Sequence, residues 1–337
     1  MALRYSMFSV CDHYPDGSRS VDQWLAEILD EIVLAEELGY HCYWVAEHHF
    51  HEYGIVTNPA QFLAVAAERT SRILLGPAVT ILPFRNPILV AEDYAFLDRI
   101  SGGRLVMGVG SGYLSHEFDG FGLDGAEKRE RFDAGVDILK RAWAGERIEG
   151  DSPGFSTRGA ELKVLPLQRP TPPIYVAVLR REAAYHVGRQ GNRMMTVPYA
   201  TLDGVEEIGA LLGEYREGLG DAGHDEPDDA APVALHAHVA ETDDEARAHA
   251  ARPFDLYVET RLYTRRQVYD DILRSGLALF GSVETVTDQL VELHELGLRH
   301  VMLMMNFGSL SQEHVHRSMR LMAEEVVPRV AAHVAPN

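Results

Sequence analysis

Short β-rich runs alternate with longer amphipathic stretches along the whole sequence, and this alternation constrains the fold more than any other feature. The run "LRYSMFSV" is typical of a strand. The stretch "SVDQWLAEILDEIVLAEELG" follows it, with apolar residues at three- and four-residue steps, as in Trp24, Ile28 and Ile32. Gly39 at the end of this stretch favours termination of a helix. The same strand-then-helix arrangement recurs to the end of the chain, which gives eight units.

Eight such units predict an α/β fold, namely a (β/α)₈ TIM barrel. Several of the expected strands are almost entirely apolar, as is usual when helices cover a parallel sheet. In such barrels the active site lies at the carboxyl ends of the strands. The strands are expected at residues 3–10, 40–47, 73–82, 104–112, 173–179, 193–198, 233–240 and 300–307.

Two stretches interrupt the alternation. One insertion, at about residues 145–172, is rich in glycine and proline and follows the fourth helix. The other, at about residues 252–282, follows the seventh strand. Long insertions on a barrel are often lids or binding loops, although either could be a plain surface excursion. No shift in composition marks a boundary, so we expect a single domain over residues 1–337.

Charge and composition exclude several classes of protein. The formal net charge of −20 argues against nucleic-acid and anionic-membrane partners, because both require a basic face. No run approaches the roughly twenty apolar residues that span a bilayer, and the first residues lack the apolar stretch of a signal peptide. The two cysteines, Cys11 and Cys42, supply no disulfide framework and are typical of a reducing compartment. We therefore expect a cytoplasmic protein.

Histidines gather in "WVAEHHFHEYG", residues 44–54, directly after the second expected strand. In a barrel this position places Glu47, His48 and His49 at the catalytic rim. An imidazole there could handle protons, bind a metal, or form ordinary hydrogen bonds. Two His-x-His pairs, His49 with His51 and His236 with His238, place imidazoles on one side of a strand.

The His-x-His pairs keep open the alternative of a metal-dependent hydrolase, since such pairs can hold zinc. Their spacing matches neither HExxH nor a cysteine-bearing zinc pattern. A catalytic zinc also needs three convergent ligands, and the spacing identifies no third one. We therefore expect no metal site, and metal analysis of the purified protein separates this alternative from the others.

Several motifs together resemble bacterial luciferase and its flavin-dependent monooxygenase relatives. The segment "WVAEHHFHEYG" with the following "NP" is similar to the second strand of that family. The segment "LGPAVTILPFRNPILVAEDYAFLDRISGGRL" resembles its third strand and helix, and "GVGSGYLSHEFDGFGLD" the loop after its fourth strand. Near the end, "GSVETVTDQLVELHELG" and "NFGSLSQEHVHRSMRLMAEEVVPRV" resemble its last helices. The resemblance covers essentially the whole chain.

This resemblance implies a two-component monooxygenase on a barrel. Such an enzyme binds reduced flavin mononucleotide (FMN), reacts it with O₂, and oxygenates a small organic substrate through a flavin C4a-hydroperoxide. The cofactor supplies the chemistry, while the protein orients it and excludes water. The sequence "GVGSG" lacks the third glycine of a dinucleotide fingerprint. We therefore expect a separate NAD(P)H:flavin reductase to supply the reduced FMN.

The resemblance also assigns roles to individual residues. His48 matches the catalytic histidine of the family, and the near-neutral pKa of an imidazole suits proton handling. His49 is the weaker catalytic candidate, because neighbouring strand residues point to opposite sides. Ala78 and Val79 match a pair whose backbone lies against the flavin ring. In the family a non-prolyl cis peptide joins this pair, so we predict a cis Ala78–Val79 bond.

The phosphate of the cofactor requires positive charge or N–H donors. Arg129 stands at the start of the fourth helix, where the family places a phosphate-binding arginine, and a guanidinium suits phosphate oxygens. The alternative for Arg129 is an exposed helix arginine that pairs with Glu127 or Asp133. Arg180 begins the fifth helix, where backbone N–H groups attract anions. Family members often have a small hydroxyl residue at that position.

Other matched positions depart from luciferase itself. Gly110 stands in place of its reactive thiol, Ser111 in place of a phosphate-binding arginine, and Leu179 in place of an acidic flavin contact. Tyr113 lies in the same loop as Gly110 and Ser111. We assign all four residues to cofactor binding by position. These departures argue against light emission from an aldehyde but not against a generic monooxygenase.

Small residues in "NPAQFLAVAAE" would let the second helix pack closely against another helix, and the family dimerises there, so we expect a homodimer. One alternative function keeps the fold and uses the deazaflavin F420 for hydride transfer. The paired histidines and their surroundings favour FMN over F420. A non-enzymatic alternative is a flavin-storage protein that binds the cofactor without turnover.

Overall fold

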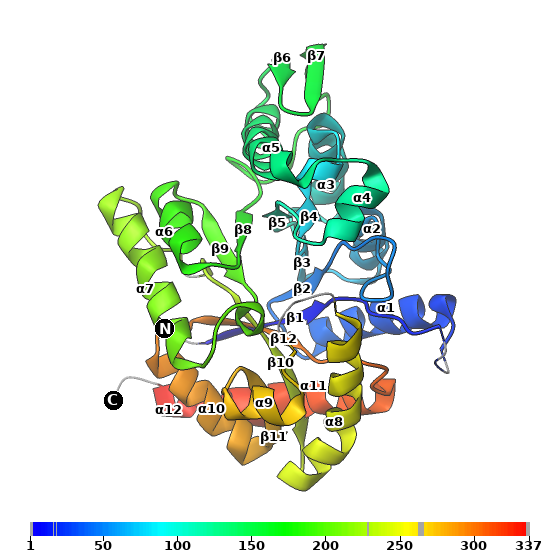
Figure 1. Ribbon diagram of the computed structural model, residues 1–337, viewed down its shortest axis with the longest axis vertical. Coiled ribbons are helices and arrows are strands. Elements are labelled where there is room, and N and C mark those ends of the chain that lie inside the picture. The colour runs from blue at the N-terminus through cyan, green and yellow to red at the C-terminus, as the bar shows by residue number, and fades with distance from the viewer. Residues whose placement is uncertain (1–2, 16, 18, 228, 262–265, 335–337) are drawn as a thin grey trace.

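Parallel strands form a nearly closed barrel in the computed structural model, as the alternation predicts (Figure 1). The structure describes residues 3–15, 17, 19–227, 229–261 and 266–334. The sheet order is β3-β2-β1-β12-β10-β9-β8-β5-β4, and every neighbouring pair in it is parallel. The strands are β1 (Arg4–Ser9), β2 (Cys42–Val45), β3 (Leu74–Pro77), β4 (Thr80–Ile81), β5 (Met107–Gly110), β8 (Ile174–Val178), β9 (Arg193–Thr196), β10 (Val233–Ala240) and β12 (His300–Met304).

The barrel closes between β3 and β5. The strands at the two ends of the sheet order, β3 and β4, are successive pieces of one chain segment. Leu75 in β3 accepts a backbone hydrogen bond from Val106 (3.0 Å) and donates one to Arg104 (2.9 Å), both just before β5. Strand β4 then pairs with β5 through Thr80 opposite Val109. The single strand expected at residues 73–82 is therefore two short strands that both contact β5.

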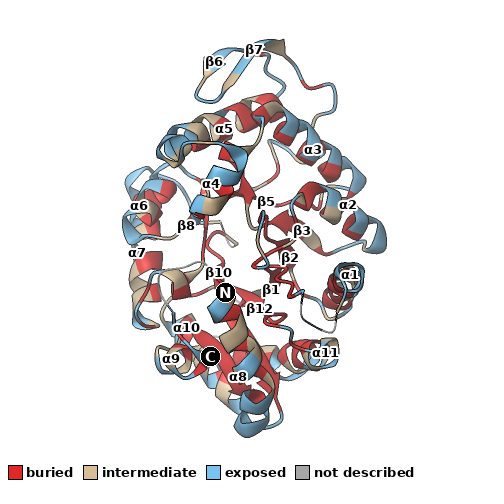
Figure 2. Cartoon of the chain, turned by 45° about the vertical axis from the view of Figure 1, so that its right-hand side comes forward, coloured by how far each residue is buried: buried red, intermediate tan, exposed pale blue. Residues whose placement is uncertain are grey.

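Helices cover the outside of the barrel, with their buried faces toward the strands (Figure 2). Asn58 and Asn86 cap α2 and α3, and a proline opens each helix. No helix among the described residues is both long enough and apolar enough to span a membrane. The helices are α1 (Val21–Glu37), α2 (Pro59–Arg69), α3 (Pro87–Ile100), α4 (Ser115–Phe121), α5 (Lys128–Trp143), α6 (Arg181–Arg189), α7 (Glu206–Asp221), α8 (Asp243–Thr260), α9 (Tyr269–Arg274), α10 (Val283–Glu295), α11 (Gln312–Leu321) and α12 (Val327–Val334), with short turns η1 (Leu82–Phe84), η2 (Gly125–Glu127), η3 (Pro198–Ala200) and the π-helical η4 (Met322–Val326).

The two insertions have secondary structure of their own. Residues 145–172 contain an antiparallel hairpin of β6 (Ile148–Ser152) and β7 (Phe155–Ala160), which projects from the molecule beside α5 (Figure 1). Residues 252–282 contain the end of α8, then α9 and β11 (Ala278–Ser282), while positions 262–265 lie outside the described residues. Strand β11 pairs in parallel with β10, so this insertion adds a strand that the alternation does not predict.

A buried carboxyl group joins three elements beneath the barrel surface. Glu31 of α1 is fully buried, and its Oε2 accepts hydrogen bonds from Tyr43 of β2 (3.0 Å) and from Asn306 Nδ2 after β12 (2.5 Å). Burial raises the pKa of Glu31 to about 8, although both hydrogen bonds oppose this shift. Glu31 therefore holds a proton in the folded protein at neutral pH.

Replacement of this carboxyl group tests its protonation. In the unfolded chain a glutamate releases its proton near pH 4.5, whereas folded Glu31 keeps it to about pH 8. The proton on Glu31 therefore makes its full contribution to the free energy of unfolding below about pH 4.5. This contribution is lost as the pH rises toward 8. We expect Glu31→Gln to gain stability relative to wild type across this window, by on the order of 1 kcal/mol per pH unit.

The measurement is urea unfolding of both proteins between pH 5 and 8. The exposed Glu37→Gln on the same helix is the control, and it should follow the wild type at every pH. Parallel curves for Glu31→Gln and wild type would contradict the assignment.

Candidate active site at the carboxyl ends of the strands

Two large side chains fill the barrel interior below its mouth. Trp44 of β2 and Tyr175 of β8 meet edge to face across the barrel, with ring centroids 5.2 Å apart, and both are almost completely buried. A Cβ atom on Gly76 of β3 would lie 2.7 Å from the indole ring, so only glycine admits the tryptophan there. An eight-stranded barrel has just enough interior space for such side chains. These rings form the floor of the mouth.

Small residues form the layer above this floor. Gly110 of β5, Ala177 of β8 and Val79 face one another: a Cβ atom on Gly110 would lie 2.5 Å from Val79 Cγ2 and 3.8 Å from Ala177 Cβ. Ala177 is exposed although its strand lies between two others. An inward-facing alanine on such a strand can be exposed only if the space above it is open. The mouth is therefore an open cleft, whereas most barrels fill this layer with branched side chains.

The predicted cis peptide bond between Ala78 and Val79 is present, which confirms that expectation. It lies where β3 ends and β4 begins. Both residues are half-buried, and the Ala78 N–H donates to the carbonyl oxygen of Val45 at 2.8 Å. This pair therefore forms one wall of the cleft, beside Gly110.

His48 is buried and closely held. Its Nδ1 lies 3.1 Å from Oε1 of Glu117 in α4, and only 1% of the Glu117 side chain is exposed. The Tyr53 ring centroid lies 4.7 Å from that of His48. A Cβ atom on Gly54 would lie 2.9 Å from both Cβ and Cδ2 of His48, so the glycine allows the loop to approach the imidazole closely.

His49 points away from His48 and has its own carboxylate. Its Nε2 lies 3.1 Å from Oε1 of Glu47, and the same oxygen accepts a hydrogen bond from Arg85 Nε at 3.0 Å. Arg85 also donates to the carbonyl oxygen of Thr57 at 2.7 Å. The two imidazoles, in the segment that follows β2, therefore contact different carboxylates.

The loop after β5 lies next to His48. The Tyr113 ring centroid is 6.2 Å from that of His48, and Ser111 and Tyr113 are both half-buried. Leu179, at the end of β8, is also half-buried. The structure thus brings Ser111 and Tyr113 to the same mouth as His48, while Leu179 lies at the end of the strand that carries Ala177.

The two arginines predicted to bind phosphate, Arg129 and Arg180, have different surroundings in the structure. Arg129 is 65% exposed, and its Nε donates to Asp133 at 2.9 Å, which is the alternative that the sequence leaves open. Arg180 is exposed at the N-terminus of α6. Lys128, which the sequence patterns did not single out, is half-buried. Its Nζ lies 3.4 Å from the carbonyl oxygen of Gly112. Of Lys128 and Arg129, which begin α5, Lys128 is therefore the one that contacts the loop after β5.

The remaining candidate histidines lie among other side chains. His236 packs against aromatic rings of Tyr199, Phe254 and Tyr257, with centroid distances of 4.8 to 4.9 Å. Burial holds its pKa well below the ordinary value. His238 contacts His249 at 3.3 Å. Within the described residues, no group of three or more His, Cys, Asp or Glu side chains could hold a metal ion.

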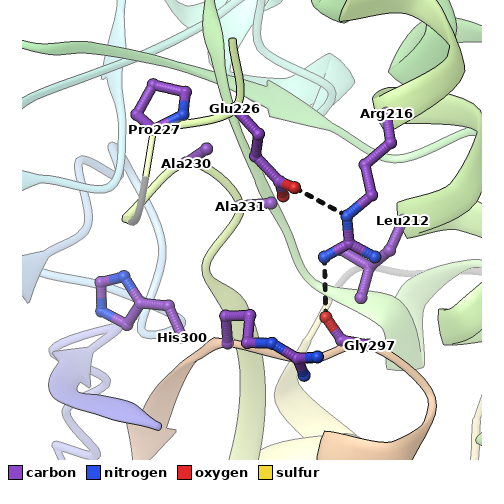
Figure 3. A pocket seen from close by; sticks show the side chains of 9 residues that line it. Leu212, Arg216, Glu226, Pro227, Ala230, Ala231, Gly297 and His300 are labelled. Carbon is purple, nitrogen blue, oxygen red and sulfur yellow. Dashed lines mark hydrogen bonds and ion pairs between the residues drawn. The ribbon is translucent and has the colours of Figure 1, made fainter. Parts of the chain in front are cut away.

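A cavity of about 320 Å³ lies at the opposite end of the barrel (Figure 3). It is lined by residues that precede β10 and β12, with Arg216 of α7 hydrogen-bonded to Glu226 at 2.9 Å and to the carbonyl oxygen of Gly297 at 2.8 Å. Barrel enzymes react at the carboxyl ends of their strands, and the amino ends serve stability. This cavity is therefore separate from the candidate site.

Comparisons with known proteins agree with this architecture. A family model described as luciferase-like monooxygenase matches residues 3–300. The chain is 29% identical in sequence to monooxygenase RslO1 from Streptomyces bottropensis. The crystal structure of that protein matches this one with a TM-score of 0.90, over 99% of this chain and 100% of that one.

Two curated relatives differ in their cofactors. The oxygenase component of flavin-dependent trigonelline monooxygenase from Acinetobacter baylyi is 26% identical over 74% of this chain and 68% of its own. The F420-dependent glucose-6-phosphate dehydrogenase of Microbacterium testaceum is 28% identical over 92% of this chain and 94% of its own. The relatives thus include oxidoreductases of both cofactor types.

Substitution of Gly54 tests the packing around His48. An added methyl group would press on His48 and on the carbonyl oxygen of Val10, 2.8 Å away. We expect Gly54→Ala to lower the free energy of unfolding by about 1–3 kcal/mol. Gly213→Ala, in an exposed part of α7 with open space around the added atom, is the matched control and should raise it by up to about 1 kcal/mol. Equal stability of Gly54→Ala and wild type in urea unfolding would refute the close contact.

Proposed function

The chain belongs to the luciferase-like monooxygenase family, and from this premise we propose that it is an FMN-dependent monooxygenase acting on a small organic substrate. When bound, reduced FMN would supply the electrons that activate O₂ for transfer of one oxygen atom to that substrate. The observation that carries the proposal is the open layer formed by Gly110, Ala177 and Val79 beside His48. The similarity to a monooxygenase structure at a TM-score of 0.90 supports it.

The residues of the mouth fit a flat ring system with an anionic tail. The ring would lie over Gly110 and against the backbone of Ala78 and Val79, where the nearest side-chain atoms to Gly110 belong to Val79 and Ala177. Ser111, Tyr113 and Leu179 would border it. Lys128 and the N-terminus of α6 at Arg180 would hold the phosphate, the latter through backbone N–H groups as well as charge.

His48 is the proposed catalytic residue. Its Nε2 makes no hydrogen bond within the described part of the chain, and this nitrogen is not closed off from solvent. An imidazole nitrogen that is open to the cleft can accept or donate a proton next to a bound ring. His49 would support the rim from the other side, through Glu47 and Arg85.

A separate NAD(P)H:flavin reductase is the proposed source of reduced FMN. The trigonelline enzyme is named as an oxygenase component, which indicates that a related protein works with a second component. The sequence here has no dinucleotide fingerprint.

Two buried free thiols, Cys11 and Cys42, support a cytoplasmic location, where thiols stay reduced.

The second candidate function is F420-dependent hydride transfer, which the relative from Microbacterium testaceum favours. One experiment separates the candidates. The apoprotein is titrated anaerobically with reduced FMN and, in parallel, with reduced F420, and each complex is then mixed with O₂. Tight binding of reduced FMN and an altered course of its oxidation support the monooxygenase. Binding of F420 alone, with no interaction with FMN in either redox state, would overturn it.

Enlargement of Ala177 tests the open layer. Leucine at this position would occupy the space above Trp44 and Tyr175, so we expect Ala177→Leu to weaken binding of reduced FMN at least about tenfold, a loss of about 1.4 kcal/mol or more. Ala248→Leu, at an exposed position of α8, is the control. Anaerobic fluorescence titration measures both, and unchanged affinity in Ala177→Leu would place the flavin elsewhere.

A homodimer is the proposed assembly. The outer faces of α2 and α3 carry exposed apolar side chains: Val65 is 48% exposed, Leu89 57%, Phe96 58% and Ile100 39%. Apolar side chains grouped on adjacent helices favour burial against a second copy. The small residues of α2 would let that copy approach closely.

Charge on this face should separate the subunits. Phe96→Glu would place a carboxylate in the buried interface, so we expect monomers by analytical ultracentrifugation at concentrations where the wild type is dimeric. Val164→Glu, which alters an exposed apolar residue near the hairpin of β6 and β7, should leave the mass unchanged. A wild type that sediments as a monomer, or a dimer that persists in Phe96→Glu, would reject this interface.

A further inference from the structure

We propose that Glu117 is a positioning residue that fixes the proton of neutral His48 on Nδ1, so that Nε2 presents its lone pair to the cleft. The inference deepens the proposed function and rests on it only for its catalytic consequence. Glu117 lies in α4, on the far side of the loop after β5, and is 69 positions away from His48 in the chain.

The hydrogen bonds of Glu117 set the direction of the His48 bond. Oε1 of Glu117 accepts from the backbone N–H of His49 at 2.9 Å and lies 3.1 Å from Nδ1 of His48. An ionised carboxylate only accepts hydrogen bonds, and two N–H groups on one oxygen satisfy it in this buried place. Nδ1 of His48 must therefore be the donor, which leaves Nε2 unprotonated in the neutral ring.

Burial makes this arrangement selective. Glu117 is completely buried, and its Oε2 has no hydrogen-bond partner among the described residues. The two N–H groups of His48 and His49 are thus the polar contacts that offset the loss of solvent around the carboxylate. If Nδ1 instead lacked a proton, two acceptors would face each other at 3.1 Å in a buried site, which costs free energy.

The ring has little freedom to escape this contact. Gly54 lies against Cβ and Cδ2 of His48, and the Tyr53 ring flanks the imidazole at 4.7 Å. A 180° flip of the ring would put Cδ2 in the place of Nδ1 and remove the bond to Glu117. The backbone N–H of His49 also ties the loop to the same oxygen, so one carboxylate fixes both the loop and the ring.

The catalytic consequence concerns the proton at Nε2. In the neutral state this nitrogen can accept a hydrogen bond or a proton from a group bound in the cleft. When it does, the resulting imidazolium lies beside the Glu117 carboxylate, which stabilises its charge. Glu117 thus acts through His48 and need not touch cofactor or substrate.

The direct test is the tautomer of His48 in the full-length protein without cofactor. Proteins labelled with ¹⁵N-histidine are examined by long-range ¹H–¹⁵N correlation at about pH 8.5, where an ordinary imidazole is neutral, and a His48→Gln variant identifies the signals. We expect the proton on Nδ1 in wild type. In Glu117→Ala we expect a mixture of tautomers. The control Glu47→Gln should change the signals of His49 and leave those of His48 in place.

A second variant separates charge from hydrogen bonding. Glu117→Gln keeps an acceptor oxygen and nearly the same volume, so it should fold and retain the Nδ1–H tautomer. It loses the negative charge, and we expect stopped-flow oxidation of its bound reduced FMN to differ from wild type by on the order of 10²-fold, a typical contribution of general acid–base groups.

The outcomes separate this inference from the proposed function. A wild-type proton on Nε2, or an unchanged tautomer in Glu117→Ala, overturns the role of Glu117 whatever the protein binds. Oxidation of bound reduced FMN at the wild-type rate in both Glu117 variants overturns its catalytic consequence. Failure to bind FMN in either redox state removes the proposed function and leaves the tautomer result standing.

Discussion

The edge-to-face contact between Trp44 and Tyr175 is the constraint on which the mouth of this barrel depends. These two rings fill the interior to a fixed height, so the layer above them can consist of Gly110 and Ala177 without collapse of the strands. A barrel filled to the rim with branched side chains would have no room for a ring system. Large side chains fill the floor and small residues form the layer above it, and this arrangement leaves a cleft at the mouth.

The two histidines at the mouth are held by separate carboxylates. His48 and His49 follow β2, and their two imidazoles contact different carboxylates. Each has its own buried carboxylate, Glu117 from α4 for His48 and Glu47 from the same loop for His49. Arg85 neutralises Glu47, while the carboxylate of Glu117 faces N–H donors alone. The carboxylate beside His49 therefore has a guanidinium partner, whereas the carboxylate beside His48 contacts N–H groups of the two histidines.

The sequence predicted the barrel and the position of His48 at the rim, because these depend on local periodicity and strand order. It could not predict the partner of His48, since contacts between segments 69 positions apart follow from tertiary packing. It named Arg129 and did not consider Lys128, which lies about 100° away around the helix and contacts the loop after β5. Strand β11 was missed because its short apolar run lies within an apparent insertion.

The proposed binding of an anionic cofactor by a chain with a net charge of −20 requires a local attraction. Exposed charges farther apart than about 10 Å are largely screened at moderate ionic strength, so the groups at the mouth decide the attraction. Lys128 and Arg180 are cations near the proposed phosphate position, and the N-terminus of α6 adds oriented N–H groups. The acidic remainder of the surface disfavours polyanionic partners. Selection of one small anion by a few donors is therefore compatible with strong overall acidity, since the two act over different distances.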